Sequence, residues 1–211
     1  MSSSTKTVAA IVAIIGWAAL ILQLYLILVN RTASIPETLF RYFGFFTILT
    51  NLLVAVSLTV VCRKGITANG HYLTRPKTLT ATAVYITVVG LIYNLILRFQ
   101  WAPEGLAKLV DELLHSVVPV LFIFFWLKFV PKQSIQWKNI LPWLVYPLLY
   151  LGYTLLRGIF VNWYPYPFIN VAAIGYSKAL VNSAMVTVAF VVVALLFVGI
   201  TKWMSKKNSS N

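Results

Sequence analysis

Of the chain's 211 residues, 60% are hydrophobic and 10% are charged, against about 25% charged in soluble domains, which excludes a water-soluble globule. The 17 lysines and arginines outnumber the four acidic residues and give a net charge of +13, but they lie between long apolar runs. They therefore indicate membrane orientation, and no nucleic-acid partner is expected.

A helix needs about 20 mostly apolar residues to cross about 30 Å of hydrocarbon. Six stretches meet or approach this length, so we predict an all-α polytopic membrane protein with one domain, residues 1–211. The first stretch is too long for the core of a signal peptide and is expected to remain as a spanning helix. The fifth is the weakest, because it is short and contains Pro142 and Pro147. The predicted spans are Val8 to Val29, Leu39 to Cys62, Leu79 to Phe99, Leu109 to Val130, Ile140 to Arg157 and Ser177 to Trp203.

Six spans place both termini on one side of the membrane, together with the second and fourth connections. The basic residues on that side are Lys6, Arg63, Lys64, Arg75, Lys77, Lys128, Lys132, Lys138, Lys202, Lys206 and Lys207, and those on the other side are Arg31, Arg41, Arg98, Lys108, Arg157 and Lys178. The positive-inside rule therefore predicts that both termini are cytoplasmic. The lack of a cleavable leader and of a retention signal favours a bacterial plasma membrane.

Polar residues spaced four apart gather in the outer third of five predicted helices. Thr47 and Asn51 share one face of the second helix, with Thr47 about 12 Å from the helix start. Asp111 and His115 share a face of the fourth, with His115 about 9 Å deep. Polar groups in hydrocarbon usually face the bundle interior, so this pattern predicts one buried polar site that opens outward. The other pairs are Asn94 with Arg98, Tyr150 with Thr154, Tyr153 with Arg157, and Lys178 with Asn182.

Each of these residues also has a purely structural interpretation. Thr47 could bond to its own backbone one turn earlier, and the His115 ring could make a structural hydrogen bond. The amides of Asn51 and Asn94 can join helices, and the cations Arg98, Arg157 and Lys178, which lie near helix ends, can snorkel. The acids Asp111 and Glu112 suit a first helical turn. An interfacial belt can be formed by the aromatic rings of Trp101, Trp163, Tyr164 and Tyr166.

Thr47 and His115 together suggest nucleophilic catalysis. A threonine hydroxyl is a poor nucleophile until a base takes its proton, and histidine is the usual base because its pKa lies near neutrality. The two residues lie at matching depth on helices that enter from the same side. Asp111 could orient the ring, although side chains four apart on a helix seldom form the in-line contact of a catalytic triad. Donors that could stabilise an oxyanion are Asn51, Asn94 and Arg98.

Three segments resemble, in the same order, parts of the androgen-induced membrane protein family. They are Phe45-Phe46-Thr47-Ile48-Leu49, Asp111-Glu112-Leu113-Leu114-His115 with Pro119 following, and Trp163-Tyr164-Pro165-Tyr166-Pro167-Phe168. That family consists of multi-spanning threonine hydrolases that cleave fatty acid esters of hydroxy fatty acids. The resemblance implies that Thr47 is the nucleophile and His115 its catalytic partner.

The chain departs from the animal members at two points. Thr50 stands where those proteins have an acid three residues after the threonine. Pro119 follows the histidine by four residues, one fewer than in the animal proteins. The chain therefore resembles a microbial branch of the family, in which the natural ester is open.

The leading hypothesis is a membrane hydrolase in which Thr47 attacks the acyl carbonyl of a membrane lipid or lipid-like ester, and His115 is the general base. This chemistry requires no metal or other cofactor. One alternative is a transporter or binding protein that holds an anionic amphiphile through Arg98, Arg157 and Lys178; another is a non-catalytic scaffold. The sequence lacks a broken helix pair in corresponding halves, which mildly favours the enzyme. It leaves the oligomeric state open.

Overall fold

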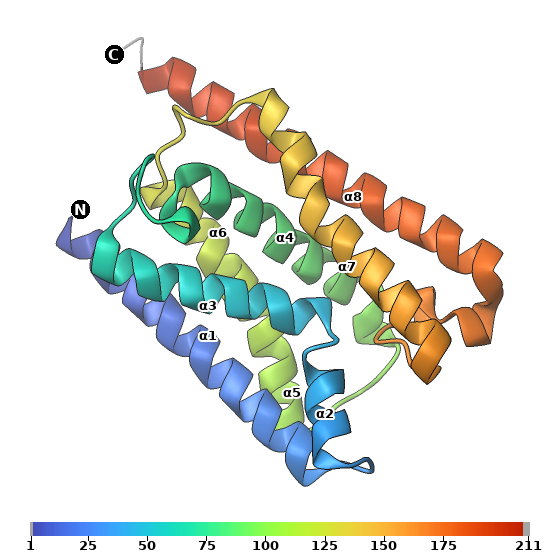
Figure 1. Cartoon of the computed structure of the whole chain (residues 1–211). Coiled ribbons are helices and arrows are strands. Elements are labelled where there is room, and N and C mark those ends of the chain that lie inside the picture. Colours follow the sequence, from blue (N-terminus) through green and yellow to red (C-terminus); the bar gives the residue numbers. More distant parts are fainter. Residues whose placement is uncertain (1, 209–211) are drawn as a thin grey trace.

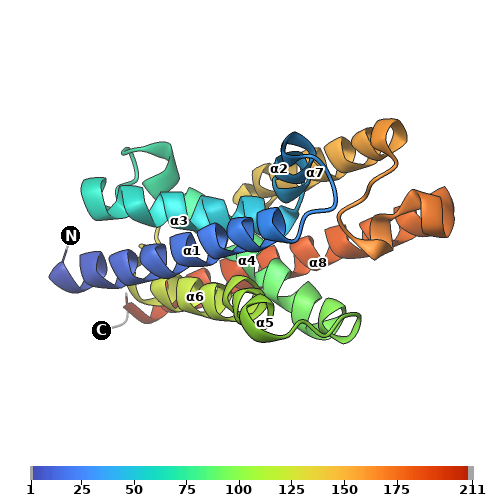
Figure 2. The ribbon, with the colours of Figure 1, turned by 90° about the horizontal axis from the view of Figure 1, so that it is seen from below.

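The computed structural model describes residues 2–208, so residues 1 and 209–211 of the predicted domain lie outside the described part. Within it, six helical segments are long and apolar enough to cross a membrane, which confirms the predicted all-α, six-span architecture. Helix α1 begins and α8 ends at the same end of the bundle (Figures 1 and 2). The segments are Ser3–Val29, Phe46–Lys64, Pro76–Phe99, Gly105–Phe129, Trp137–Val161 and Val171–Lys206.

Residues 2–208 form eight α-helices with short turns between them, of which α2 lies outside the six segments (Figure 1). The helices are α1 (Ser3–Val29), α2 (Ile35–Tyr42), α3 (Phe46–Lys64), α4 (Pro76–Leu95), α5 (Gly105–Glu112), α6 (Val118–Phe129), α7 (Ile140–Val161) and α8 (Val171–Asn208). A π-helical turn, η3 (Leu113–Val117), joins α5 to α6, and 3₁₀ turns occupy η1 (Tyr72–Thr74), η2 (Leu97–Phe99), η4 (Trp137–Asn139) and η5 (Pro167–Ile169). Five of the six spans thus agree with the sequence prediction to within a few residues at each end.

The second span begins later than the sequence predicts. The chain from Leu39 first completes the separate helix α2, turns, and starts α3 at Phe46. Gly44 lies in this turn, where a Cβ atom would overlap Nη1 of Arg157. Thr47 therefore lies in the first turn of α3, and the expected position about 12 Å along a helix is wrong.

The core of the bundle lies around α3 and α4, which the other helices cover. Small residues of α1 let it run close along α3, as Figure 2 shows, and Ala9 and Ala19 are fully buried. The apolar side chains of α7 and α8 that face outward, such as Leu149 and Leu196, are exposed, as expected for helix faces that contact lipid. The largest fully buried side chains are Trp126, Phe122, Phe125, Leu58, Leu79 and Ile86.

Lys132 caps the C-terminal end of α6. Its Nζ donates to the carbonyl oxygens of Trp126, at 2.6 Å, and Leu127, at 3.2 Å, and also to that of Val130. The last carbonyls of a helix have no helical donors, so a cation is favourable at this position. Lys132 is only 7% exposed. Its buried hydrogen bonds tie the connection between α6 and α7 to the end of α6.

We predict that Lys132→Ala lowers the free energy of unfolding by about 2 kcal/mol, because three buried carbonyls lose a charged donor. Lys128→Ala is the matched control, since Lys128 is an exposed lysine at the same end of α6. It should change the free energy by less than about 0.5 kcal/mol. The measurement is reversible unfolding in mixed micelles, followed by circular dichroism. Equal effects of the two substitutions would contradict the capping role.

Candidate functional site

The π-helical turn η3 carries His115 and is held by two amides. Asn51 donates to the carbonyl oxygens of Thr47, at 2.9 Å, and Leu114, at 3.1 Å. Asn94 donates to the carbonyl oxygen of His115 at 3.3 Å. Both amides thus donate to backbone oxygens, which fixes α3 and α4 against the π-helical turn. Such turns are rare and occur frequently at functional sites.

Pro119 explains why the His115 carbonyl needs a side-chain donor. In a regular helix the N–H of residue 119 would bond to this oxygen, but proline has none. Gly90 allows α4 to approach the same place, because a Cβ atom there would lie 3.2 Å from the His115 carbonyl oxygen. Pro119 therefore leaves the His115 carbonyl oxygen without a helical donor, and Gly90 lets α4 come close enough for a side chain of α4 to donate a hydrogen bond to it.

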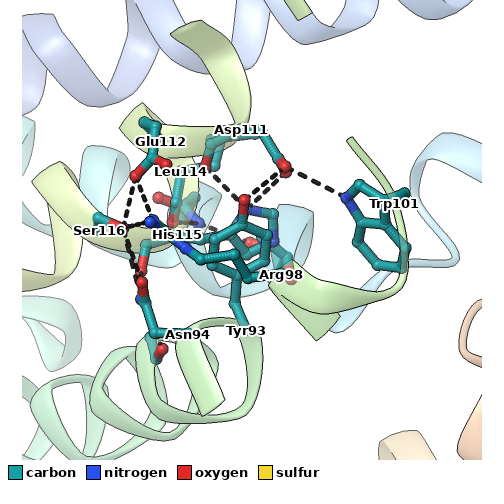
Figure 3. Close-up of polar contacts among 12 residues, drawn as sticks. Tyr93, Asn94, Arg98, Trp101, Asp111, Glu112, Leu114, His115 and Ser116 are labelled. Atoms are coloured by element: carbon teal, nitrogen blue, oxygen red, sulfur yellow. Dashed lines mark hydrogen bonds and ion pairs between the residues drawn. The ribbon is translucent and has the colours of Figure 1, made fainter. Parts of the chain in front are cut away.

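The imidazole of His115 is oriented by Asp111 (Figure 3). Nδ1 lies 2.9 Å from the Asp111 carbonyl oxygen and 3.0 Å from Oδ1 of the same residue. A carbonyl oxygen can only accept, so Nδ1 carries a proton, and in the neutral ring Nε2 has the free lone pair. The ring of Tyr93 stacks on the imidazole with the centroids 4.2 Å apart. The hydrogen bond of Nδ1 is thus to the backbone of Asp111, and the carboxylate lies beside it at ion-pair distance.

The second carboxylate oxygen of Asp111 is held from another direction (Figure 3). Tyr93 donates its hydroxyl to Oδ2 at 2.7 Å, and Trp101 donates its indole N–H at 3.2 Å. Trp101 therefore bonds to the site in addition to any role in an interfacial belt. Tyr93 has no signal in the sequence, because it lies one position before Asn94 in an apolar helix.

Arg98 belongs to a separate polar cluster beside the π-helical turn. Its Nη2 lies 2.5 Å from Oε2 of Glu112 and 3.2 Å from the Ser116 hydroxyl. Ser116 also donates to Glu112 at 2.9 Å. The positive charge of Arg98 is thus neutralised within the chain, as the close-up shows (Figure 3).

Thr47 lies in the first turn of α3, where backbone N–H groups have no helical acceptor. Its N–H donates to the hydroxyl of Tyr166 at 3.2 Å, and its Oγ1 lies 3.3 Å from the same oxygen. The preceding N–H, of Phe46, donates to the hydroxyl of Tyr150 at 3.2 Å. Two tyrosines therefore complete the start of α3.

Tyr166 reaches the site from the connection between α7 and α8. A residue of an interfacial aromatic belt would face the membrane surface, but the Tyr166 hydroxyl points inward to Thr47. Burial raises the pKa of Tyr166, so the phenol stays protonated at neutral pH and can donate a hydrogen bond. The only sequence signal for this position is the Trp-Tyr-Pro-Tyr segment that resembles the hydrolase family.

Two cavities meet at Thr47 and His115. The α8 cavity has a volume of about 70 Å³ and lies among mostly apolar side chains of α4, α7 and α8, such as Val89, Leu151 and Phe190. The α1 cavity has a volume of about 220 Å³ and lies between α1, α2 and α5. Both are lined by Thr47, Leu97, His115 and Tyr166, and the α1 cavity also by Trp101 and Asp111. The hydroxyl and the imidazole thus belong to one polar junction between two hydrophobic chambers.

Two further cations of the sequence analysis lie outside this junction. Arg157 is buried between aromatic rings near the end of α7, so it does not snorkel outward. Lys178 is exposed on α8. Among residues 2–208, no group of three or more His, Cys, Asp or Glu side chains is placed to hold a metal ion.

The fold and this junction define a class, a polytopic helical membrane protein with a threonine and a histidine–aspartate pair at one end of its bundle. The chain matches no protein-family model, no curated protein and no solved structure.

We predict opposite neutral tautomers for the two histidines. His115 should carry its proton on Nδ1, whereas His71 should carry it on Nε2, because its Nδ1 accepts the Leu73 N–H at 3.3 Å. Nitrogen-15 NMR of histidine-labelled protein, at a pH where both rings are neutral, distinguishes the two forms. A His71→Gln variant assigns the signals. An Nε2-protonated His115 would contradict the orientation described here.

Proposed function

We propose that the protein is an integral membrane hydrolase of lipid esters, with Thr47 as nucleophile and His115 as general base. The observation that carries this proposal is that both residues line the same two cavities, while Nδ1 of His115 is engaged by Asp111. The resemblance to the threonine hydrolases of the androgen-induced membrane protein family supports the same assignment.

The reaction proceeds in two acyl-transfer steps. Nε2 of His115 takes the proton of the Thr47 hydroxyl as the oxygen attacks the ester carbonyl. The resulting imidazolium faces the Asp111 carboxylate and then gives its proton to the departing alcohol, which leaves an acyl ester on Thr47. Water next loses a proton to His115 and attacks that ester, the bond between the acyl group and Oγ1 breaks, and the imidazolium returns its proton to Oγ1, so the fatty acid leaves and the hydroxyl is restored.

The start of α3 offers stabilisation for the tetrahedral oxyanion. The positive end of the helix dipole lies at Thr47, and the Tyr166 hydroxyl adds a donor 3.3 Å from the attacking oxygen. Asn51 and Arg98 do not act here, since both are engaged elsewhere, by carbonyl oxygens and by Glu112 respectively. They position the π-helical turn and its histidine.

The two cavities suit the two halves of a lipid ester. The α8 cavity, with its apolar lining, accommodates the acyl chain, and the α1 cavity, which Trp101 and Asp111 also line, accommodates the alcohol. The excess of basic residues at the end where α1 begins supports an orientation in which both termini are cytoplasmic and the junction lies in the outer half of a membrane, such as a bacterial plasma membrane.

We predict that a fluorophosphonate probe labels the intact protein once, at Thr47. Thr47→Ala should abolish the mass increase, and His115→Ala should slow it by about 100-fold or more because the base is lost. Thr50→Ala is the control, since Thr50 is a buried threonine of the same helix and should label at the wild-type rate. Intact-protein mass spectrometry follows the reaction. Labelling that survives both site substitutions would refute the assignment.

We predict that Tyr166→Phe lowers kcat for a p-nitrophenyl ester by about 10- to 100-fold with little change in KM, because the hydroxyl acts mainly on the transition state. Tyr164→Phe, in the same connection, removes a hydroxyl that has no contact with Thr47 and should leave kcat unchanged. An unchanged kcat in Tyr166→Phe would restrict this residue to completing the start of α3.

A further inference from the structure

Arg157 is a buried cation near the end of α7. Its exposed fraction is 7%, and Nε is completely covered without a hydrogen-bond partner. Within residues 2–208, no carboxylate lies within ion-pair distance of its guanidinium. A buried charge without a partner is costly, so this arginine stands apart from the other cations of the bundle.

Two aromatic rings enclose the guanidinium. Its central carbon lies 4.2 Å from the ring centroid of Phe40 and 4.4 Å from that of Trp163. Cation–π contacts stabilise the faces of the planar group by about 0.5 to 2 kcal/mol each. They do not satisfy its N–H donors, which point from the edge of the plane. The aromatic rings therefore fix the orientation of the group and leave its hydrogen-bonding capacity unused.

The acids of the chain do not supply the missing partner. The sequence contains four, and Glu37 is paired with Arg41 at 2.8 Å, while Glu112 is paired with Arg98. Asp111 is engaged by His115, and Glu104 is exposed just before α5. Arg157 therefore has no carboxylate partner among the described residues.

The position of Arg157 suits a ligand at the membrane surface. It lies four residues before Val161, the last residue of α7, which corresponds to a depth of about 6 Å. Headgroup oxyanions lie in this region of a bilayer. The ring of Trp163 contacts that of Phe45, with the centroids 5.5 Å apart, and Phe45 lines the α1 cavity. An amphiphile anchored here would have its chain close to Phe45, in the wall of the α1 cavity.

We propose that Arg157 binds the oxyanion headgroup, a carboxylate or phosphate, of an amphiphile. A guanidinium presents parallel N–H donors that fit such a group bidentately, and its planar faces are already fixed by the two rings. Of the three cations that the sequence suggested for an anionic amphiphile, Arg98 is neutralised by Glu112 and Lys178 is exposed, so Arg157 alone carries the site. The proposal is independent of hydrolysis.

The test is binding of dodecyl phosphate to the full-length protein in a neutral maltoside detergent, measured by isothermal titration calorimetry. Inorganic phosphate is titrated in parallel. The variants are Arg157→Gln, which removes the charge, Arg157→Lys, which keeps the charge but loses the planar fork, and Lys178→Gln as an exposed control cation. Gel filtration and circular dichroism verify that each variant is folded.

We expect dodecyl phosphate to bind wild-type protein and Lys178→Gln equally, Arg157→Lys several-fold more weakly, and Arg157→Gln at least about tenfold more weakly. Inorganic phosphate should bind far more weakly than dodecyl phosphate if the anion is a lipid headgroup. Comparable binding of both, still lost in Arg157→Gln, would assign the site to a free oxyanion. An affinity for dodecyl phosphate that Arg157→Gln leaves unchanged would overturn the proposal. If Arg157→Gln does not fold, an unchanged affinity in Arg157→Lys overturns it equally.

Discussion

The hydrogen bonds from Asn51 and Asn94 to the backbone at residues 114 and 115 are the constraint on which the site depends. In hydrocarbon, a backbone carbonyl without a donor costs several kcal/mol, so irregular backbone persists only where neighbouring helices supply partners. Here α3 and α4 each supply one amide to the π-helical turn. Because His115 lies in that turn, the bonds that make the irregular backbone tolerable also determine where its imidazole points.

The pairing of charges at the end of the bundle that holds His115 explains which side chains remain available for proton transfer or ligand binding. Glu112 neutralises Arg98 and Glu37 neutralises Arg41, whereas Asp111 faces a histidine whose charge varies with its protonation. The histidine pair is the one suited to moving a proton, because imidazole is the side chain that ordinarily changes its charge near neutral pH. The guanidinium of Arg157 is left as fixed positive charge without a counterion in the described chain, which makes it a binding group and not an acid or base.

Hydropathy was sufficient to predict the spans, because lipid requires long apolar helices and little else in this chain is as apolar. Counting spans also placed Thr47 and His115 at one end of the bundle. The break before Phe46 was not predictable, since the run from Leu39 to Leu49 contains no proline and Gly44 alone marks the turn. The inward position of Tyr166 was missed for a different reason, because tyrosines between spans usually belong to the interface. Such contacts join residues more than a hundred positions apart, and no local pattern encodes them.

The late start of α3 changes the chemistry available to Thr47. In the middle of a continuous helix its N–H would be bonded to a carbonyl and its hydroxyl would tend to bond to the preceding turn. At the first turn the N–H is free of helical partners, the dipole of α3 adds partial positive charge, and a phenol approaches both groups. This position suits the proposed nucleophile, because negative charge on its oxygen would develop beside donors that are already oriented. The helix break is therefore what distinguishes Thr47 from Thr50, another buried threonine of α3, which is only part of the wall between helices.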